Sequence, residues 1–272
     1  MGLEEIELPK RKVGVALSGG AASGFAHIGV LAVLEKEGIP IDMIAGTSAG
    51  ALMGALYAQG RDINEIKRVM TGLGRERVSY ITQLVLAKTH LIRARKAKSW
   101  LRTLIGDTEF KDLRIPFACV ATDIITGEEV IINQGSVAKG IRASGSVPVI
   151  VPVFKLDGRY VVDGGLVNPV PVSVLKKMGA DFIIAVNTIT DKSKGLKPGN
   201  KKPNIFKVMR QVFHISRYQG VRASLIGADV VIKPQVAHIR FGHFHRAQES
   251  ILQGEVAAQN SIPEIKRRLG LG

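Results

Sequence analysis

Val13-Gly-Val-Ala-Leu17 runs directly into Ser18-Gly-Gly-Ala-Ala-Ser-Gly24, and this stretch decides the fold class. The first segment has the character of a short buried strand, and the second is a glycine-rich turn. From Phe25 to Glu37, apolar residues recur at the spacing of a helix. A strand, a tight turn and a helix in this order form the unit from which parallel sheets are built.

The same order recurs farther along the chain. Residues 41–45 are a strand candidate, 46–50 a tight turn and 51–59 a helix of small residues. Further elements are predicted as strands at 115–121, 130–132 and 181–186, and as helices from Asp62, at 170–178, from Pro203 and in the exposed tail that ends in Lys266-Arg-Arg268. Short apolar strands that alternate with helices predict an α/β fold with a mostly parallel central sheet.

Composition narrows the function classes. The chain has 272 residues, which is long enough to bury a full core without disulfides. Its one cysteine, Cys119, lies in an apolar run and is expected to be buried and unreactive. The net charge of +15 favours anionic partners, namely a phospholipid surface, nucleic acid or an acidic substrate. With an aromatic content of 5% and no recognised nucleic-acid motif, nucleic acid is not the expected partner.

Gly46-Thr-Ser-Ala-Gly50 has the G-x-S-x-G form and stands between a predicted strand and a predicted helix. This is the setting of a nucleophile elbow, where the turn is so sharp that glycines must flank the serine. Ser48 would lie near a helix N-terminus, whose dipole favours a developing alkoxide. Ser48 is therefore the candidate nucleophile.

The turn from Gly19 to Gly24 also follows a strand and precedes a helix. It lacks the G-K-[ST] ending of a nucleotide-binding P-loop, and its glycines do not have the G-x-G-x-x-G spacing of a dinucleotide site. The remaining functional use is an oxyanion hole, in which the backbone N–H groups of Gly19, Gly20 and Ala21 hold the negative oxygen of a tetrahedral intermediate.

Val161-Val162-Asp163-Gly164-Gly165 ends an apolar strand with a carboxylate and two glycines. A serine nucleophile needs a base within hydrogen-bonding reach. Asp163 can be that base if the fold brings it against Ser48.

These three motifs, in this order, resemble the patatin-like phospholipase family over about residues 13–186. In that family the glycine-rich loop forms the oxyanion hole, the G-x-S-x-G serine is the nucleophile and the aspartate of a D-G-G or D-G-A motif completes a Ser–Asp dyad. Segments 25–31, 143–148 and 168–172 also resemble those of the family. The chain departs from the family loop G-G-G-x-[RK]-G at Ala21 and at Ser23, where the basic residue is absent.

The resemblance implies a three-layer α/β/α fold, a lipid ester such as a (lyso)phospholipid as substrate, an acyl-enzyme on Ser48 and no cofactor or metal. With no linker evident, we expect one domain. It would comprise an N-terminal extension at 1–12, a catalytic core at 13–190 and a basic loop with a C-terminal helical part at 191–272. The basic segments 88–98 and 191–203 would contact an anionic membrane surface. The segment Met1–Lys12 lacks the apolar region of a signal peptide, so a cytoplasmic protein, peripheral on the inner membrane face, is expected.

Two other hypotheses remain open. An α/β-hydrolase with a Ser-His-Asp triad would recruit one of the late histidines His214, His238, His243 and His245. A binding or regulatory module that has lost its chemistry is suggested by Ser23. The residues near His238 include no carboxylate or cysteine to complete a zinc site, and His27 is expected to be a packing residue. The sequence gives no oligomeric state.

Overall fold

The computed structural model describes residues 11–76, 99–190 and 204–271. Its strands form one sheet in the order β5-β6-β3-β2-β1-β7-β8, with β4 paired to β3. The neighbours from β3 through β2, β1 and β7 to β8 are parallel, whereas β4, β5 and β6 pair antiparallel. The strands are β1 (Val13–Leu17), β2 (Met43–Thr47), β3 (Phe117–Asp123), β4 (Glu129–Ile132), β5 (Phe154–Leu156), β6 (Arg159–Asp163), β7 (Phe182–Val186) and β8 (Val230–Ile232).

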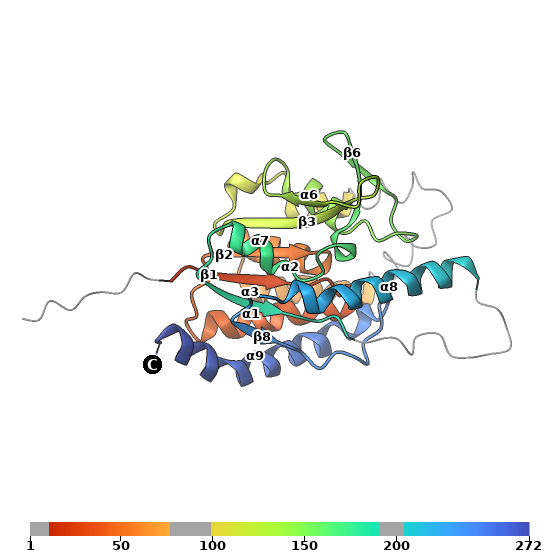
Figure 1. Cartoon of the computed structure of the whole chain (residues 1–272). Coiled ribbons are helices and arrows are strands. Elements are labelled where there is room, and N and C mark those ends of the chain that lie inside the picture. The colour runs from red at the N-terminus through yellow and green to blue at the C-terminus, as the bar shows by residue number, and fades with distance from the viewer. Residues whose placement is uncertain (1–10, 77–98, 191–203, 272) are drawn as a thin grey trace, which may run out of the picture.

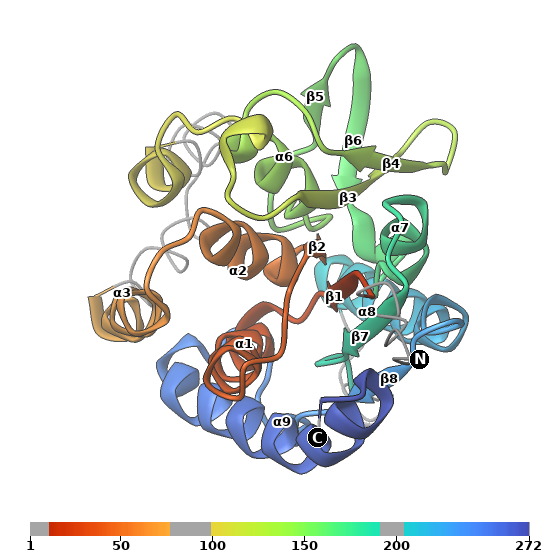
Figure 2. The same ribbon diagram turned by 90° about the vertical axis from the view of Figure 1, so that its left-hand side faces the viewer.

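Helices cover both faces of this sheet (Figure 1). On one side lie α1, α2 and α3, on the other α7 and α8, and α9 crosses α1 and β8 (Figure 2). The helices are α1 (Ala26–Lys36), α2 (Ala49–Ala58), α3 (Ile63–Glu76), α6 (Val137–Ser144), α7 (Val172–Lys177), α8 (Ile205–Ser224) and α9 (Ala247–Leu269), with short 3₁₀ turns η1 (Ala21–Phe25), η2 (Phe110–Asp112), η3 (Gly164–Leu166) and η5 (Phe244–Arg246). Two apolar cores, one on each face, give the three layers that were expected.

The expected strand–turn–helix units are confirmed, with small shifts of their ends. The second strand lies at 43–47 rather than 41–45 because its last residues pair with β3 and lead into the turn at Ser48. The first helix begins after η1, which occupies the glycine-rich turn. The strand expected to end at Asp163 is β6, but its hairpin partner β5, the helix α6 and the short strand β8 were not predicted. The basic segments at 88–98 and 191–203 lie outside the described residues. Of the extension at 1–12, only the last two residues, 11 and 12, are described.

The C-terminal helix α9 is more than an exposed tail. Arg267 and Arg268 lie at its surface as expected, but Ile251, Ala258 and Ile262 are buried against the rest of the core. α9 approaches α1 so closely that a Cβ on Gly29 or Gly254 would overlap backbone atoms of the other helix. The expectation of an exposed helix was wrong for this face, because the tail closes the core over α1.

The expectation for Cys119 has a structural counterpart. Cys119 lies on β3 with no exposed surface, and burial raises the pKa of its thiol, so it is inert as predicted. Among the described residues, no helix combines the length and the apolar character needed to cross a membrane.

The α1–α9 crossing predicts a strong effect of a single methyl group. Gly254→Ala places that methyl against the backbone of α1, where no side-chain rotation relieves the overlap, so we expect a loss of about 1–3 kcal/mol in the free energy of unfolding. Urea denaturation measures it. Gly72→Ala on α3 is the matched control, because its added methyl group meets no atom within 4 Å and should leave stability unchanged or slightly raised. Equal effects of the two substitutions would contradict the close crossing.

Candidate active site

The serine of residues 46–50 lies at a sharp turn between β2 and α2. Ser48 has φ 55° and ψ −114°, a conformation that a non-glycine residue adopts only where the surrounding structure holds it. Its N–H donates to the Ser144 hydroxyl of α6 at 2.8 Å. Gly46 and Gly50 permit the turn, because a Cβ on either would overlap backbone atoms. The local geometry is that of a nucleophile elbow.

The register of β3 brings Asp163 to this turn. Thr47, at the end of β2, pairs with Val120, and Asp163, at the end of β6, pairs with the next residue, Ala121. The ends of the two strands therefore meet at one level of β3. The Ser48 hydroxyl lies close enough to the Asp163 carboxylate to favour its charged form.

Backbone contacts fix the position of Asp163. Its N–H donates to the Ser146 carbonyl at 3.0 Å, its carbonyl accepts from the Thr122 hydroxyl at 2.9 Å and Oδ1 accepts from the Gly165 N–H at 2.8 Å. A Cβ on Gly164 would overlap the Val120 carbonyl, so this position must be glycine for β6 to end here. The carboxylate is thus aimed by the strand end and the turn after it.

The carboxyl group of Asp163 is fully buried. Burial raises its pKa, and the Ser48 hydroxyl, the Gly165 N–H and the positive charge of Arg217 oppose that rise. Oδ2 makes no hydrogen bond of standard geometry within the described residues. Catalytic hydrogen bonds commonly tighten only when substrate binds.

The glycine-rich loop offers two backbone donors. Gly19 does not donate to the site as expected, because its N–H is taken by the Pro169 carbonyl at 3.1 Å. The N–H groups of Gly20 and Ala21 have no hydrogen-bond partner within the described part of the chain. Ala21 has φ 52°, so it adopts the backbone conformation that a glycine would adopt at this position. The alanine at this position therefore does not prevent the left-handed turn of the loop.

Side chains from two segments hold this loop. The Ser23 hydroxyl donates to the Gly20 carbonyl at 2.8 Å, and the Thr188 hydroxyl, just after β7, donates to the Gly19 carbonyl at 3.1 Å. The Ser18 hydroxyl accepts from the Thr188 N–H at 2.9 Å. The Ser23 hydroxyl is neutral and is used within the loop, so it brings no positive charge to the site.

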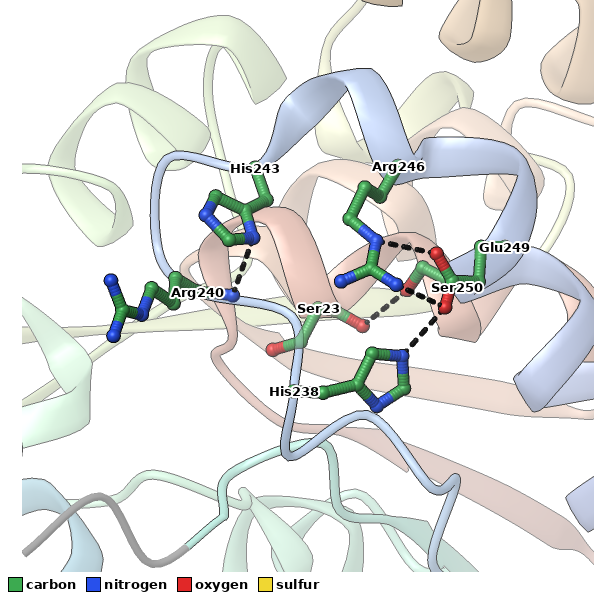
Figure 3. A network of polar contacts seen from close by, with 7 residues as sticks. All are labelled: Ser23, His238, Arg240, His243, Arg246, Glu249 and Ser250. Atoms are coloured by element: carbon green, nitrogen blue, oxygen red, sulfur yellow. Dashed lines mark hydrogen bonds and ion pairs between the residues drawn. The ribbon is translucent and has the colours of Figure 1, made fainter. Parts of the chain in front are cut away.

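The start of α9 braces the loop from the other side (Figure 3). The Ser250 hydroxyl donates to the Ser23 carbonyl at 3.0 Å, and Phe244 meets Phe25 edge to face with ring centroids 6.1 Å apart. Figure 3 also shows Glu249 between His238 and Arg246, which fixes this end of α9. The C-terminal part of the chain thus supports the candidate oxyanion loop directly.

The histidines have other contacts. His27 is fully buried on α1 with its Nε2 2.7 Å from the Ser18 carbonyl, so that nitrogen must donate, and the packing role expected for it is supported. His238 pairs with Glu249 at 2.7 Å, and His243 Nδ1 accepts from the Arg240 N–H at 3.3 Å. The side chains that act on the Asp163 carboxylate are the hydroxyl of Ser48 and the guanidinium of Arg217, and neither is an imidazole. No group of three or more potential metal ligands occurs among the described residues.

A groove between α3 and α9 lies apart from these groups. Its wall includes Lys67, Arg68 and Glu255, and none of its lining residues belongs to β2, β6 or the glycine-rich loop. Its size is therefore no argument that it binds the substrate of Ser48.

Sequence reasoning missed the residues that reach the site from distant segments. Ser144 supports the Ser48 turn, Ser250 the loop, and Arg217 of α8 is buried near Asp163. One signal for Arg217 was present in the sequence. Phe213, Arg217 and Val221 recur every fourth residue, so a charged residue stands on the buried apolar stripe of a helix.

The fold and the site together define a class of protein. A serine at a strand–helix turn, close to a buried carboxylate and to a glycine-rich loop, is the arrangement of serine hydrolases. The family model "Patatin-like phospholipase" matches residues 15–176. The chain belongs to the patatin-like phospholipase family, as its motifs indicated.

Several curated proteins are similar over the same part of the chain. An uncharacterized NTE family protein of Mycobacterium tuberculosis is 34% identical over 176 residues, which are 65% of this chain and 49% of that protein. Neuropathy target esterase sws of Drosophila melanogaster is 34% identical over 185 residues, 66% of this chain and 13% of that protein. Lysophospholipase NTE1 of Scheffersomyces stipitis is 34% identical over 183 residues, which are 66% of this chain and 12% of that protein. The matched region is thus half or less of each relative.

A solved structure confirms the fold. The crystal structure of VipD from Legionella pneumophila superposes with a TM-score of 0.52 at 14% sequence identity, covering 93% of this chain and 67% of VipD. At this identity the likeness concerns the architecture, which extends beyond the family-matched segment.

The burial of His27 predicts a pH dependence of stability. Desolvation lowers the pKa of its imidazole from 6.5 to about 4 in the folded protein, so the unfolded chain binds the proton more tightly and stability falls as pH drops from 6.5 towards 4. Between pH 7 and pH 5 this residue should account for a loss of about 2 kcal/mol. Urea unfolding at both pH values measures it, and His27→Gln should reduce the loss by that amount. An identical pH dependence in the variant would contradict a buried neutral imidazole.

Proposed function

We propose that this protein hydrolyses carboxylic esters of lipids, (lyso)phospholipids or related molecules, through a Ser48–Asp163 dyad and an acyl-enzyme. The observation that carries the proposal is the buried Asp163 carboxylate beside the elbow hydroxyl of Ser48. Family membership supports lipid acyl hydrolysis, and relatives carry the names lysophospholipase and neuropathy target esterase. Those relatives are much longer, so their activities are not transferred whole.

The proposed reaction has two steps. Ser48 Oγ attacks the ester carbonyl carbon while Asp163 accepts the hydroxyl proton, and the Gly20 and Ala21 N–H groups stabilise the oxyanion. The C–O bond to the lipid alcohol then breaks, the alcohol leaves with the proton from Asp163, and the acyl group stays on Ser48. In the second step Asp163 takes a proton from water, the hydroxide oxygen attacks the acyl carbon, and the fatty acid leaves as Ser48 recovers its proton.

We also infer that residues 13–190 form the catalytic core and that 191–272 complete the same domain. The contacts of α9 with α1 and of Ser250 with the oxyanion loop support this division. The extension at 1–12 has no part in the proposed chemistry.

Substitution of the dyad tests the proposed reaction. Ser48→Ala removes the nucleophile and Asp163→Asn the base, so each should lower the release of p-nitrophenol from short- and medium-chain esters by at least about 10³-fold. Ser261→Ala, which removes a hydroxyl that donates to the Ala257 carbonyl of the same helix α9, is the control and should retain full activity.

Two outcomes would contradict the dyad. Full activity of Ser48→Ala excludes this nucleophile. A collapse of activity on replacing one of His214, His238, His243 or His245 by Ala would favour the Ser-His-Asp triad instead.

The protein is further proposed to dock on an anionic membrane, at its cytoplasmic face, through α8. This helix begins beyond the carboxyl ends of the parallel strands, the edge that carries Ser48 (Figure 1). Ile205, Met209 and Val212 recur at helical spacing and are 65%, 44% and 52% exposed. Apolar side chains on a strongly basic protein favour insertion among acidic lipids.

Vesicle sedimentation tests this surface. The double substitution Ile205→Ser/Val212→Ser should reduce partitioning onto phosphatidylcholine–phosphatidylglycerol vesicles about tenfold, because two apolar side chains no longer enter the lipid. Leu252→Ser/Val256→Ser is matched in exposure but lies on α9, and should bind like the wild type. Equal losses in both pairs would place the contact elsewhere.

A further inference from the structure

The candidate oxyanion loop lacks a positive charge of its own. Ser23 stands at the basic position of the family pattern, and its hydroxyl is directed at the carbonyls of Gly20 and Thr188. The reaction proposed above develops negative charge at this loop and needs an ionised carboxylate next to it. A cation nearby would favour both.

A buried arginine reaches this place from another segment. Arg217 lies on α8, outside residues 15–176, and is 5% exposed. A Cβ built on Gly19 would lie 3.5 Å from Arg217 Nη1 and also 3.5 Å from the Cβ of Ser48. The guanidinium group and the nucleophile therefore flank the same glycine.

Arg217 also lies against the carboxylate turn. A Cβ on Gly165 would lie 2.8 Å from Arg217 Cδ and 2.9 Å from Asp163 Oδ1. The second glycine of the Asp-Gly-Gly motif thus leaves the space through which the arginine side chain passes. Its charge acts on Asp163 across this space.

The hydrogen bonds and ring contacts that Arg217 makes with described residues do not compensate the cost of burying its charge. The ring of Phe213 lies 5.5 Å from the guanidinium carbon, which gives a cation–π contact, but Nε has no hydrogen-bond partner in the described part of the chain. Removing a cation from water without close polar partners is costly. The nearby anion that compensates it is Asp163.

We propose that Arg217 is the positioning residue of this active site, supplying through Asp163 and the Gly19–Ala21 loop the positive charge that Ser23 does not provide. The inference rests on the proposed Ser48–Asp163 dyad. It also bears on the hypothesis that the chain is an inactive module, since the charge is not lost but comes from α8.

Arg217 should set the acid limit of the reaction. The groups that act on the Asp163 carboxylate are the Ser48 hydroxyl, the Gly165 N–H and Arg217, and of these only Arg217 carries a charge. Burial raises the pKa of Asp163, and the cation opposes that rise. Removing the cation raises this pKa further, so the base is ionised, and the serine reactive, only at higher pH.

The test uses the full chain and a fluorophosphonate probe. Ser48 Oγ forms a bond to phosphorus, fluoride leaves, and the hydroxyl proton passes through Asp163 to solvent, so labelling reports the dyad without turnover. Labelling rates, followed by mass spectrometry from pH 5 to pH 9, are compared for wild type, Arg217→Met and Arg217→Lys. The acid limb is the part of the pH profile in which the labelling rate falls as the pH is lowered. Arg217→Met should move the acid limb up by about 1 pH unit or more and lower the labelling rate at pH 7 about tenfold, and Arg217→Lys should stay closer to wild type.

Arg142→Met is the matched control for burial. Arg142 is a second buried arginine, on α6, whose guanidinium donates to Ser146 and to the Pro152 carbonyl and which is not among the charges acting on Asp163. Its loss should lower the melting temperature without moving the acid limb.

The outcomes separate the two proposals. Failure of the wild type to be labelled at Ser48 overturns the proposed function. Labelled wild type with an unmoved acid limb in folded Arg217→Met, like that of Arg142→Met, overturns the role of Arg217 and leaves it a packing residue. If Arg217→Met does not fold, the limb of Arg217→Lys decides, because a lysine that restores the charge keeps the wild-type limb and one that shifts it by 1 unit or more contradicts the proposal.

Discussion

The pairing of β3 with both β2 and β6 is the constraint on which the site depends. Val120 and Ala121 are consecutive, and they fix the ends of two strands that arrive from opposite directions. A slip of one residue in either register would turn Asp163 or Ser48 to the other face of the sheet. Glycines on both sides of these strand ends then allow backbone and side chains to approach closely enough for chemistry. The sheet, rather than any single loop, therefore determines the geometry of the dyad.

The family-matched segment contains the proposed nucleophile, the proposed base and the candidate oxyanion loop, but not everything that holds them. Thr188 and Ser250 brace the loop, and α8 contributes Arg217. All three follow residue 176, where the family match ends. The proposed active site is thus built by two parts of the chain. Its reactive groups come from the family-matched segment, and part of their electrostatic and mechanical support comes from residues that follow it.

Features that depend on neighbouring residues could be predicted from the sequence, whereas contacts between distant segments could not. Ser48 and Asp163 could be proposed from the sequence because a strand end, a glycine and a reactive side chain are adjacent in the chain. Gly19 was misassigned because its N–H is taken by Pro169, a residue of a distant segment. Ser144 and Arg217 reach the site through tertiary packing, which periodicity does not reveal. The helical tail was recognised, but its buried face depends on a glycine-to-glycine crossing that only the three-dimensional arrangement shows.

The bond from Ser250 to Ser23 links one of the last helices to one of the first turns. During synthesis β1, β2 and β6 leave the ribosome well before α9, so Ser48, Asp163 and the glycine-rich loop exist in the nascent chain before the loop is braced. The bracing of the candidate oxyanion loop therefore waits for α9. A chain truncated before α9 carries the motifs without the support that Ser250 gives to that loop.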